Sequence, residues 1–207
     1  MTHPGFFLVL EGGDGVGKST QAQLLTEWLG SPVGGFAEVI HTREPGGTEL
    51  GVALRDAVMH GGHVAPRAEA LLYAADRAHH IATVVRPALE RGAAVVQDRY
   101  VDSSIVYQGG ARGLGDQVEK ISRWATEDLM PDLTVVLDME PSADRMARDL
   151  DRVEAETASR AQEIRQAYRD LARAGGDRYV VVGADRDPAS VSHDIQQAVT
   201  AALESRG

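Results

Sequence analysis

Four glycines, a lysine and a serine follow a short apolar run in the stretch VLEGGDGVGKST, residues 9–20. Gly12, Gly17, Lys18 and Ser19 fit the pattern G-x-x-x-x-G-K-[ST] of a phosphate-binding loop. Glycines let backbone N–H groups turn toward a polyphosphate, the lysine reaches its β- and γ-phosphates, and the serine hydroxyl ligates Mg²⁺. A plain glycine-rich turn is the alternative. The apolar run before the loop and the helical pattern after it favour the phosphate site.

Arginines stand at four places where they could surround a transferring phosphoryl group. Arg43 lies in TREPGG, Arg55 in ALRDA, Arg77 in LLYAADRAHH and Arg99 in QDRY. Phosphoryl transfer needs aligned reactants and positive charge around the transferred group, and a guanidinium can hold a phosphate by two parallel hydrogen bonds. Arg99 is the strongest candidate, because it directly follows an apolar run and Asp98. For Arg55, a solvated surface position explains the sequence equally well.

Two aspartates could act beside these cations. Asp98 ends the run before Arg99, where P-loop proteins often carry an acid, and it could hold Mg²⁺ through water or orient Arg99. Asp14 lies inside the loop, where phosphates would repel its carboxylate. If Asp14 has a functional role, we therefore expect it to contact a hydroxyl group or a metal. The alternative for Asp14 is an aspartate that only stabilises the turn.

Polar side chains recur at helical spacing in DRYVDSSIVYQGG. Ser104 and Gln108 are four residues apart, as are Ser103 and Tyr107, so each pair can share a helix face. Serine and glutamine can hydrogen-bond the edge of a base, and tyrosine can pack against a sugar, although the serines could simply cap a helix. Tyr73 could stack on a base or belong to the core, and the sequence leaves both open.

Apolar runs and helical patterns alternate along the chain and must position these residues. Short apolar runs predict strands over residues 6–10, 38–42, 93–97, 133–139 and 178–184. Helical spacing predicts helices over residues 20–29, 50–59, 67–85, 116–128, 142–150, 155–174 and 189–204. Pro66 and Pro87 bound the helix over residues 67–85. This alternation predicts an α/β fold with a parallel sheet covered by helices, and ligands then bind beyond the carboxyl ends of the strands.

The composition is that of an ordinary globular chain. Its 207 residues are 43% hydrophobic and 25% charged, enough for one α/β domain with a core. The formal net charge of −10 disfavours nucleic acid as the main partner, although a local arginine cluster can still bind a nucleotide. The absence of cysteine excludes disulfides and thiol catalysis. Because we find neither a membrane-spanning run nor a signal peptide, we expect a cytoplasmic protein without a membrane partner.

Several longer motifs follow one another along the chain. They are EGGDGVGKST, TREPGGT, LLYAADRAHH, DRYVDSSIVYQGG, PDLTVVLD and DRVEAE. In this order and spacing the chain resembles the bacterial thymidylate kinases over nearly its whole length, and TREPGG with DRY…S…YQG is far more specific than the P-loop. The resemblance implies transfer of the ATP γ-phosphate to dTMP with Mg²⁺, giving dTDP and ADP. It also implies a homodimer and a single P-loop NTPase domain over residues 1–207, with a five-stranded parallel sheet and a short helical lid near residues 145–154.

The resemblance also implies roles for individual residues, carried over by motif. The residues that would bind ATP are Gly12, Gly13, Asp14, Gly15, Val16, Gly17, Lys18, Ser19 and Thr20. The residues that would contact dTMP are Asp14, Pro45, Arg55, Tyr73, Arg77, Arg99, Ser104, Tyr107 and Gln108. Arg77 would meet both the dTMP phosphate and the base, Arg99 would reach the transferring phosphoryl group, and Tyr107 would crowd a 2′-hydroxyl. Ser19 and Asp98 would hold the metal. A cis peptide bond is implied before Pro45.

The lid departs from the family pattern. The stretch RMARDLDRVE, residues 145–154, is a few residues shorter than in related sequences. Arg148 and Arg152 are its candidate contacts to the ATP phosphates, and the sequence leaves open which of the two reaches them. The residues that we expect to be catalytic are then Lys18, Arg99, Asp14, Arg148 and Arg152.

Two other functions stand beside a dTMP kinase. A kinase of free deoxynucleosides would share the P-loop, but its acceptor carries no phosphate and would not need both Arg77 and Arg99. A nucleotide-binding module that transfers nothing is the second alternative, and the intact Lys18, Ser19 and Asp98 argue against it. Comparing ADP production with dTMP and with thymidine would separate the two kinases.

Overall fold

A five-stranded sheet forms the centre of the computed structural model, which describes residues 5–141 and 152–206. The strands are β1 (Phe6–Glu11), β2 (Val39–Arg43), β3 (Ala94–Asp98), β4 (Leu133–Asp138) and β5 (Tyr179–Gly183). All neighbours pair in parallel in the order β2-β3-β1-β4-β5. The predicted α/β fold is therefore confirmed, and each predicted strand matches an observed one to within a residue at either end.

The carboxyl ends of the parallel strands lie at one edge of the sheet. In the register, Asp98 of β3 is paired with Leu10 of β1 on one side and with Arg43 of β2 on the other. The P-loop after β1, the TREPGG loop and Arg99 after β3 therefore start next to one another. Every residue of β1 is buried, because this central strand has neighbours on both sides and helices on both faces.

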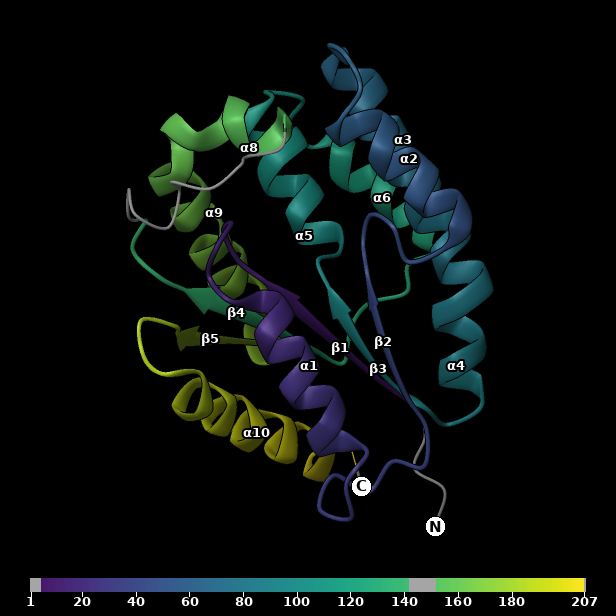
Figure 1. Cartoon of the computed structure of the whole chain (residues 1–207), viewed down its shortest axis with the longest axis vertical. Coiled ribbons are helices and arrows are strands. Elements are labelled where there is room, and N and C mark those ends of the chain that lie inside the picture. The colour runs from purple at the N-terminus through teal and green to yellow at the C-terminus, as the bar shows by residue number, and fades with distance from the viewer. Residues whose placement is uncertain (1–4, 142–151, 207) are drawn as a thin grey trace.

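Helices cover both faces of the sheet (Figure 1). On one face, alternate residues of β1 pack against α1 (Lys18–Leu29) and α10 (Pro188–Glu204), which lie together in the figure. On the other face, Phe7 and Val9 pack against the segment that follows α3 (Pro66–His80). The other α-helices of the described residues are α2 (Glu49–Met59), α4 (Arg86–Glu90), α5 (Val101–Ser104), α6 (Gln117–Thr126), α8 (Arg152–Thr157) and α9 (Ala161–Gly175).

The helix predicted over residues 67–85 does not stop before Pro87. After α3, the chain forms the π-helical turn η1 (Ile81–Val85) and continues into α4, which contains Pro87. Proline lacks the N–H for the helical ladder, and its ring crowds the carbonyl group one turn earlier. A π turn at this place changes which backbone groups are paired. The prediction that Pro87 bounds the helix is therefore wrong, because the proline changes the path of the helix without ending it.

The prediction of one unbroken helix over residues 155–174 is wrong. The structure divides it into α8, the 3₁₀ turn η3 (Ala158–Arg160) and α9. Arg160 leaves the helical backbone angles, with φ of −109° and ψ of 13°, and its guanidinium bonds to the carbonyl of Ala111. A contact between distant segments thus outweighs the local helical spacing. The helix predicted over residues 142–150, and with it most of the predicted lid, lies outside the described residues.

None of the helices in residues 5–141 and 152–206 combines the length and the apolar character needed to cross a membrane.

Candidate active site

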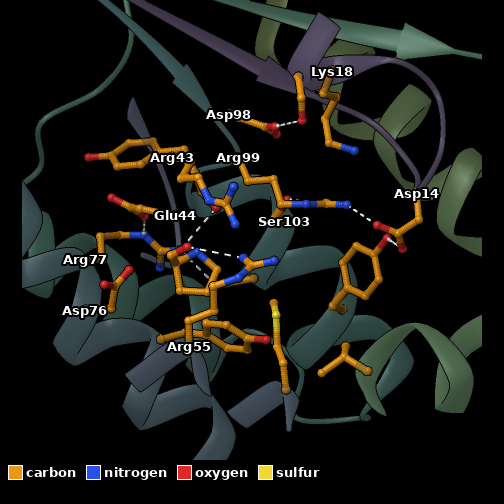
Figure 2. A pocket seen from close by; sticks show the side chains of 18 of the residues that line it. Asp14, Lys18, Arg43, Glu44, Arg55, Asp76, Arg77, Asp98, Arg99 and Ser103 are labelled. Atoms are coloured by element: carbon orange, nitrogen blue, oxygen red, sulfur yellow. Dashed lines mark hydrogen bonds and ion pairs between the residues drawn. The ribbon is translucent and has the colours of Figure 1, made fainter. Parts of the chain in front are cut away.

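A cavity of about 390 Å³ opens at the carboxyl edge of the sheet. Figure 2 shows Lys18 and Asp98 at one end of it, Arg55 and Arg77 at the other, and Arg99 between them. The predicted site residues that line it are Asp14, Gly15, Gly17, Lys18, Ser19, Thr20, Pro45, Arg55, Tyr73, Arg77, Asp98, Arg99, Ser104, Tyr107 and Gln108. The predicted residues that do not line it are Gly12, Gly13, Val16 and Arg152. Arg148 lies outside the described residues.

The P-loop joins β1 to α1 and requires glycine at two positions. Gly12 has a φ of +134°, and a Cβ there would lie 2.6 Å from the carbonyl oxygen of Leu137. Gly17 has a φ of +96° at the N-cap of α1. Both conformations disfavour a side chain. The helix begins at Lys18, earlier than the predicted start at residue 20, so its unpaired N–H groups and the positive end of its dipole face a ligand of the loop.

Lys18 folds over this loop. Its Nζ donates to the carbonyl oxygens of Gly12 at 3.0 Å and Gly13 at 2.6 Å. Burial, and next the nearby charge of Arg99, lower the pKa of Lys18 to about 8. Two neutral carbonyl groups do not replace the full hydration of an ammonium group, so an anionic ligand would favour its charged form.

Ser19 and Asp98 place two oxygen groups side by side at the donor end of the cavity. Ser19 Oγ donates to Asp98 Oδ2 at 2.9 Å, whereas Asp98 Oδ1 is buried and has no hydrogen-bond partner in the described chain. An unpartnered buried carboxylate oxygen is costly unless a cation completes it. Hydroxyl and carboxylate oxygens are the ligands that Mg²⁺ prefers, together with substrate phosphates and water. The residues present therefore fit Mg²⁺ bound with a nucleotide. Residues 5–141 and 152–206 hold no cluster of three acidic or histidine side chains that would bind a metal alone.

Arg99 lies between the two ends of the cavity in a strained backbone conformation, with φ of +67°. Its guanidinium forms an ion pair with Asp14 and donates to Ser103 Oγ at 2.9 Å and to Tyr168 Oη at 3.2 Å. Tyr107 donates to the second oxygen of Asp14 at 2.6 Å, and its ring centroid lies 5.3 Å from the guanidinium carbon of Arg99. Burial alone would lower the pKa of Arg99, but the Asp14 carboxylate reverses this and raises it well above the usual value.

Glu11, the last residue of β1, fixes the segment that follows Arg99. Its buried carboxylate accepts hydrogen bonds from the backbone N–H groups of Tyr100 at 2.8 Å and Ser103 at 3.1 Å. It also accepts from the Ser103 hydroxyl group at 2.6 Å. The central strand thus anchors the start of α5 and holds Ser103 at the place where it meets Arg99.

Arg77, from α3, is held in place by several partners. Its Nε donates to Glu44 Oε2 at 2.7 Å, and its Nη1 donates to Ser122 Oγ at 3.0 Å. Its Nη2 donates to the Tyr100 carbonyl and to Ser104 Oγ, both at 3.1 Å. One bond from Nε, one from Nη1 and two from Nη2 occupy four of the five N–H groups, so one N–H of Nη1 has no partner among residues 5–141 and 152–206.

The chain of buried polar groups continues beyond Arg77. The other carboxylate oxygen of Glu44 lies 2.9 Å from His80 Nδ1, and His80 Nε2 lies 2.6 Å from Thr42 Oγ1. Arg77, Glu44 and His80 are only 3%, 4% and 0% exposed. Buried polar side chains that are hydrogen-bonded to one another in this way are rigid, so the guanidinium of Arg77 is oriented before a ligand arrives.

The loop after β2 is held from two sides. Arg55 Nη1 donates to the Pro45 carbonyl at 3.2 Å, and the Gly46 N–H donates to Asp76 Oδ1 at 3.4 Å. The Glu44–Pro45 peptide bond is cis, as the resemblance implies. Asp76 Oδ2 is buried without a partner among the described residues. Burial, and next the charge of Glu44, raise the pKa of Asp76 to about 6.

The helical segment after Arg99 carries three of the predicted dTMP contacts. It consists of α5 and the π-helical η2 (Ile105–Ala111), a form that is frequent at functional sites. Ser104, Tyr107 and Gln108 line the cavity from it. Tyr73 lines the cavity from α3 and also packs, half-buried, against a hydrophobic cluster. Both interpretations of Tyr73, a ligand contact and a core residue, are therefore compatible with its place.

Arg152, expected in the lid, belongs to a different cluster. Its Nη2 donates to Glu69 Oε2 at 2.5 Å, its Nε donates to the Val58 carbonyl at 2.9 Å, and its Nη1 pairs with Glu156. Glu69 Oε1 accepts from Gln108 Nε2 at 2.9 Å. The structure therefore brings Arg152 together with a predicted dTMP contact and does not bring it to the P-loop.

Several residues that organise the site have no place in the sequence-based set. They are Glu11, Glu69, His80 and Tyr168. Glu11 was detectable in principle, because it ends β1 at the edge where ligands bind. Nothing in the spacing of the other three signals a contact with the site.

Fold and site together define a class of protein. A P-loop after the central strand of a parallel sheet, beside a cavity lined by arginines, is the arrangement of a P-loop phosphotransferase. The family model described as Thymidylate kinase matches residues 10–195. The chain belongs to the thymidylate kinase family.

Individual relatives support this assignment along nearly the whole chain. A protein named thymidylate kinase from Clavibacter michiganensis subsp. michiganensis is 55% identical over 189 residues, which cover 88% of each chain. One of the same name from Leifsonia xyli subsp. xyli is 54% identical over 200 residues, or 93% of each chain. A more distant thymidylate kinase, from Shouchella clausii, is 41% identical over 210 residues, or 97% of each chain.

Proposed function

We infer that the protein transfers the γ-phosphoryl group of ATP to dTMP, giving dTDP and ADP. One observation carries this inference: a single cavity has P-loop Lys18 at one end, Arg77 at the other and Arg99 between them. An acceptor that already carries a phosphate brings negative charge toward another phosphate, and cations must offset it. A free deoxynucleoside would not need the arginines at the acceptor end.

At the donor end, we propose that residues 12–20 bind the ATP phosphates through backbone N–H groups and through Lys18. The ammonium group would exchange the carbonyl oxygens of Gly12 and Gly13 for phosphate oxygens. Because charge accumulates on the phosphoryl oxygens during transfer, the lysine would stabilise the transition state more than the ground state.

At the acceptor end, we propose that the free N–H of Arg77 and the guanidinium of Arg99 hold the dTMP phosphate. Arg99 would also follow the transferring group, since it lies nearest to the P-loop, 3.3 Å from the Gly12 carbonyl oxygen. Asp14 and Tyr107 would face the sugar, with Asp14 accepting a hydrogen bond from its hydroxyl. The base would meet Tyr73, Ser104 and Gln108, with Pro45 and Arg55 at the rim.

We propose Mg²⁺ as the metal of the reaction, held by Ser19 and Asp98. The fit rests on the hydroxyl group of Ser19 and on the buried, unpartnered Oδ1 of Asp98. When bound, the ion would neutralise charge on the donor phosphates and orient them. Without the ion, the hydrogen bond to Asp98 keeps the Ser19 hydroxyl group turned toward the Asp98 carboxylate.

Three further points belong to the same proposal. We propose a single domain of residues 1–207, located in the cytoplasm, with a lid near residues 145–154 in which Arg148 approaches the ATP phosphates. Arg152 is the weaker candidate, because Glu69, Glu156 and the Val58 carbonyl already bind it.

We also propose a homodimer. Val52 on α2, Leu71 on α3 and Trp124 on α6 are exposed apolar side chains, 58%, 56% and 82% exposed. Light scattering tests this point, and the mass of one 22.2 kDa chain at micromolar concentration would contradict it.

A coupled assay of ADP release tests the activity. We expect turnover with ATP, Mg²⁺ and dTMP, and none above background with thymidine. Turnover with thymidine but not dTMP would establish the deoxynucleoside kinase instead. Nucleotide binding without ADP release from any nucleoside or monophosphate would establish a module that transfers nothing.

A further inference from the structure

Gln108 and Glu69 form a buried pair at the wall of the cavity. Gln108 lines the cavity and is 2% exposed, while Glu69, from α3, is 0% exposed. The two side chains share one hydrogen bond, in which Gln108 Nε2 donates to Glu69 Oε1 at 2.9 Å. A glutamine carboxamide can turn either its oxygen or its nitrogen toward a neighbour, so the neighbour decides which atom faces the other way.

The carboxylate of Glu69 is held in its ionised form. Arg112 donates to both of its oxygens, at 3.2 and 3.1 Å, and Arg152 donates to Oε2 at 2.5 Å. Burial would raise the pKa of Glu69, but the hydrogen bonds from Arg152, Gln108 and Arg112 together lower it. An ionised carboxylate only accepts hydrogen bonds. Glu69 therefore offers Gln108 no donor.

This chemistry fixes the direction of the Gln108 carboxamide. If the amide turned over, its oxygen would face the Glu69 carboxylate oxygen, which cannot donate, and this buried acceptor would be left unpaired, at a cost of about 1–3 kcal/mol. With Nε2 bound to Glu69, the remaining polar atom is Oε1. Among residues 5–141 and 152–206, the one hydrogen bond of the Gln108 side chain is that of Nε2, and none ends on this oxygen. The side chain therefore presents an acceptor to the cavity, and not a donor.

We propose that Glu69 is a positioning residue that selects the base of the acceptor nucleotide by fixing the Gln108 carboxamide with its oxygen toward the cavity. The proposal rests on the proposed function. A base with an imide N–H, such as thymine, can donate to this oxygen. Cytosine has an unprotonated ring nitrogen at the same position, and its lone pair would face Oε1. Glu69 thus excludes cytosine nucleotides without touching them.

The variant Glu69→Gln tests this, because a carboxamide at position 69 can donate as well as accept. Gln108 can then turn over and offer its NH₂ group to the cytosine ring nitrogen. In the full-length enzyme we expect the ratio of kcat/KM for dTMP to that for dCMP to fall about tenfold or more, as one buried mismatch costs 1.4 kcal/mol or more. An unchanged ratio would overturn the proposal.

A matched control separates positioning from loss of the ion-pair cluster. Arg112→Gln removes a cation from the same cluster but leaves the Glu69 carboxylate in place, so the dTMP to dCMP ratio should stay within about twofold. Glu69→Asp keeps an acceptor-only group and should retain discrimination. If Arg112→Gln lowers the ratio as much as Glu69→Gln does, the cluster acts as a scaffold only, and the proposal fails.

The wild-type enzyme provides a second measurement in case Glu69→Gln does not fold. The side-chain NH₂ resonance of Gln108, assigned by its loss in Gln108→Leu, should stay in the same bonded position when dTMP is added. A shift of this NH₂ group from Glu69 to the base would overturn the proposal. Failure of either test leaves the phosphorylation of dTMP intact, because that activity is measured separately on the wild-type enzyme.

Discussion

The two ends of the cavity are built in different ways. At the donor end, consecutive residues of one loop supply most of the chemistry, with Asp98 the addition from a distant segment. In residues 5–141 and 152–206, the hydrogen bonds of the Lys18 side chain go to the carbonyl groups of Gly12 and Gly13. At the acceptor end, Arg77 bonds to Glu44, 33 positions away, and to Ser122, 45 positions away. One end is local in sequence and leaves its charge to be completed by a ligand. The other is assembled from distant segments and satisfies most of its hydrogen bonds within the protein.

Because of this difference, we expect the two ends to contribute differently to catalysis and to the stability of the fold. A charged side chain whose partner is the ligand adds little to the stability of the fold, but it stabilises the transition state of the reaction. A charge that is fully partnered in the interior contributes orientation, and removing one partner leaves the other buried and uncompensated. Substitutions at the donor end should therefore reduce turnover, whereas substitutions in the acceptor network should reduce the free energy of unfolding.

The largest effect is expected from Lys18→Ala at the donor end. We expect kcat to fall about 10³-fold, because the lost cation acts mainly on the transferring phosphoryl group. The free energy of unfolding should change by no more than about 1 kcal/mol. Steady-state kinetics, urea unfolding and calorimetry with dTMP measure the three quantities. An equal loss of dTMP affinity would show that the two ends are not separate.

Glu44→Gln is the corresponding change at the acceptor end. The carboxamide keeps only one accepting oxygen and no charge, so the buried Arg77 loses its counter-charge, and we expect the free energy of unfolding to fall by about 3 kcal/mol. Urea denaturation measures this. The control Glu38→Gln breaks an exposed pair with Arg91, in which the side chains are 43% and 54% exposed, and should leave the free energy of unfolding close to that of the wild type. Equal losses in the two variants would mean that the buried network stabilises no more than a surface pair.

Arg99→Lys probes the boundary between the two ends. Lysine keeps the positive charge but loses the planar fork that reaches Asp14 and Ser103 at the same time. We expect kcat to fall about 10²-fold, in the range of removing one donor to the transition state. The exposed Arg91→Lys serves as the control and should keep kcat. A normal kcat with a raised KM for dTMP would make Arg99 a ground-state binder that belongs to the acceptor end only.

The smallest effect concerns Asp76, whose pKa is raised to about 6 in the folded protein. Because the folded state binds the proton more tightly than the unfolded state, the contribution of Asp76 to stability is present at low pH. It is lost as the pH rises through about 6. Asp76→Asn should therefore be more stable than the wild type at pH 8, and this advantage should shrink by about 1 kcal/mol at pH 5. Urea unfolding at both values measures it, and a constant difference would contradict the raised pKa.

The sequence predicts the donor end and the sheet better than the acceptor end, for a physical reason. Strands and the P-loop depend on neighbours in sequence, so apolar runs and the spacing from Gly12 to Ser19 contain the information needed. That the site lies beyond the carboxyl ends of the strands follows from a general rule about parallel sheets, whereas the strand order that sets Arg43 beside Asp98 comes from the structure.

The acceptor end depends on pairs that no local pattern marks. His80 meets Glu44 because α3 packs beside the end of β2, and Glu69 meets Arg152 across 83 positions. For the same reason, helical spacing makes Arg152 as good a candidate for the ATP phosphates as Arg148, although the fold pairs Arg152 with Glu69. Helical spacing predicts which residues share a face of a helix, but it does not predict which distant residues they contact in the folded protein.

The order of the strands has a consequence for the lifetime of the protein. β1 lies between β3 and β4, so the loop that follows it gains its shape only when residues from the middle of the chain flank it on both sides. Long-range pairing of this kind forms slowly compared with local helices, and an unfolded chain has no nucleotide site at all. Nucleotides therefore bind only the native state, and at a concentration one hundred times Kd a ligand adds about 2.7 kcal/mol to the free energy of unfolding. A cell well supplied with substrate would then keep more of this enzyme folded and out of reach of proteases, and a starved cell would lose it faster.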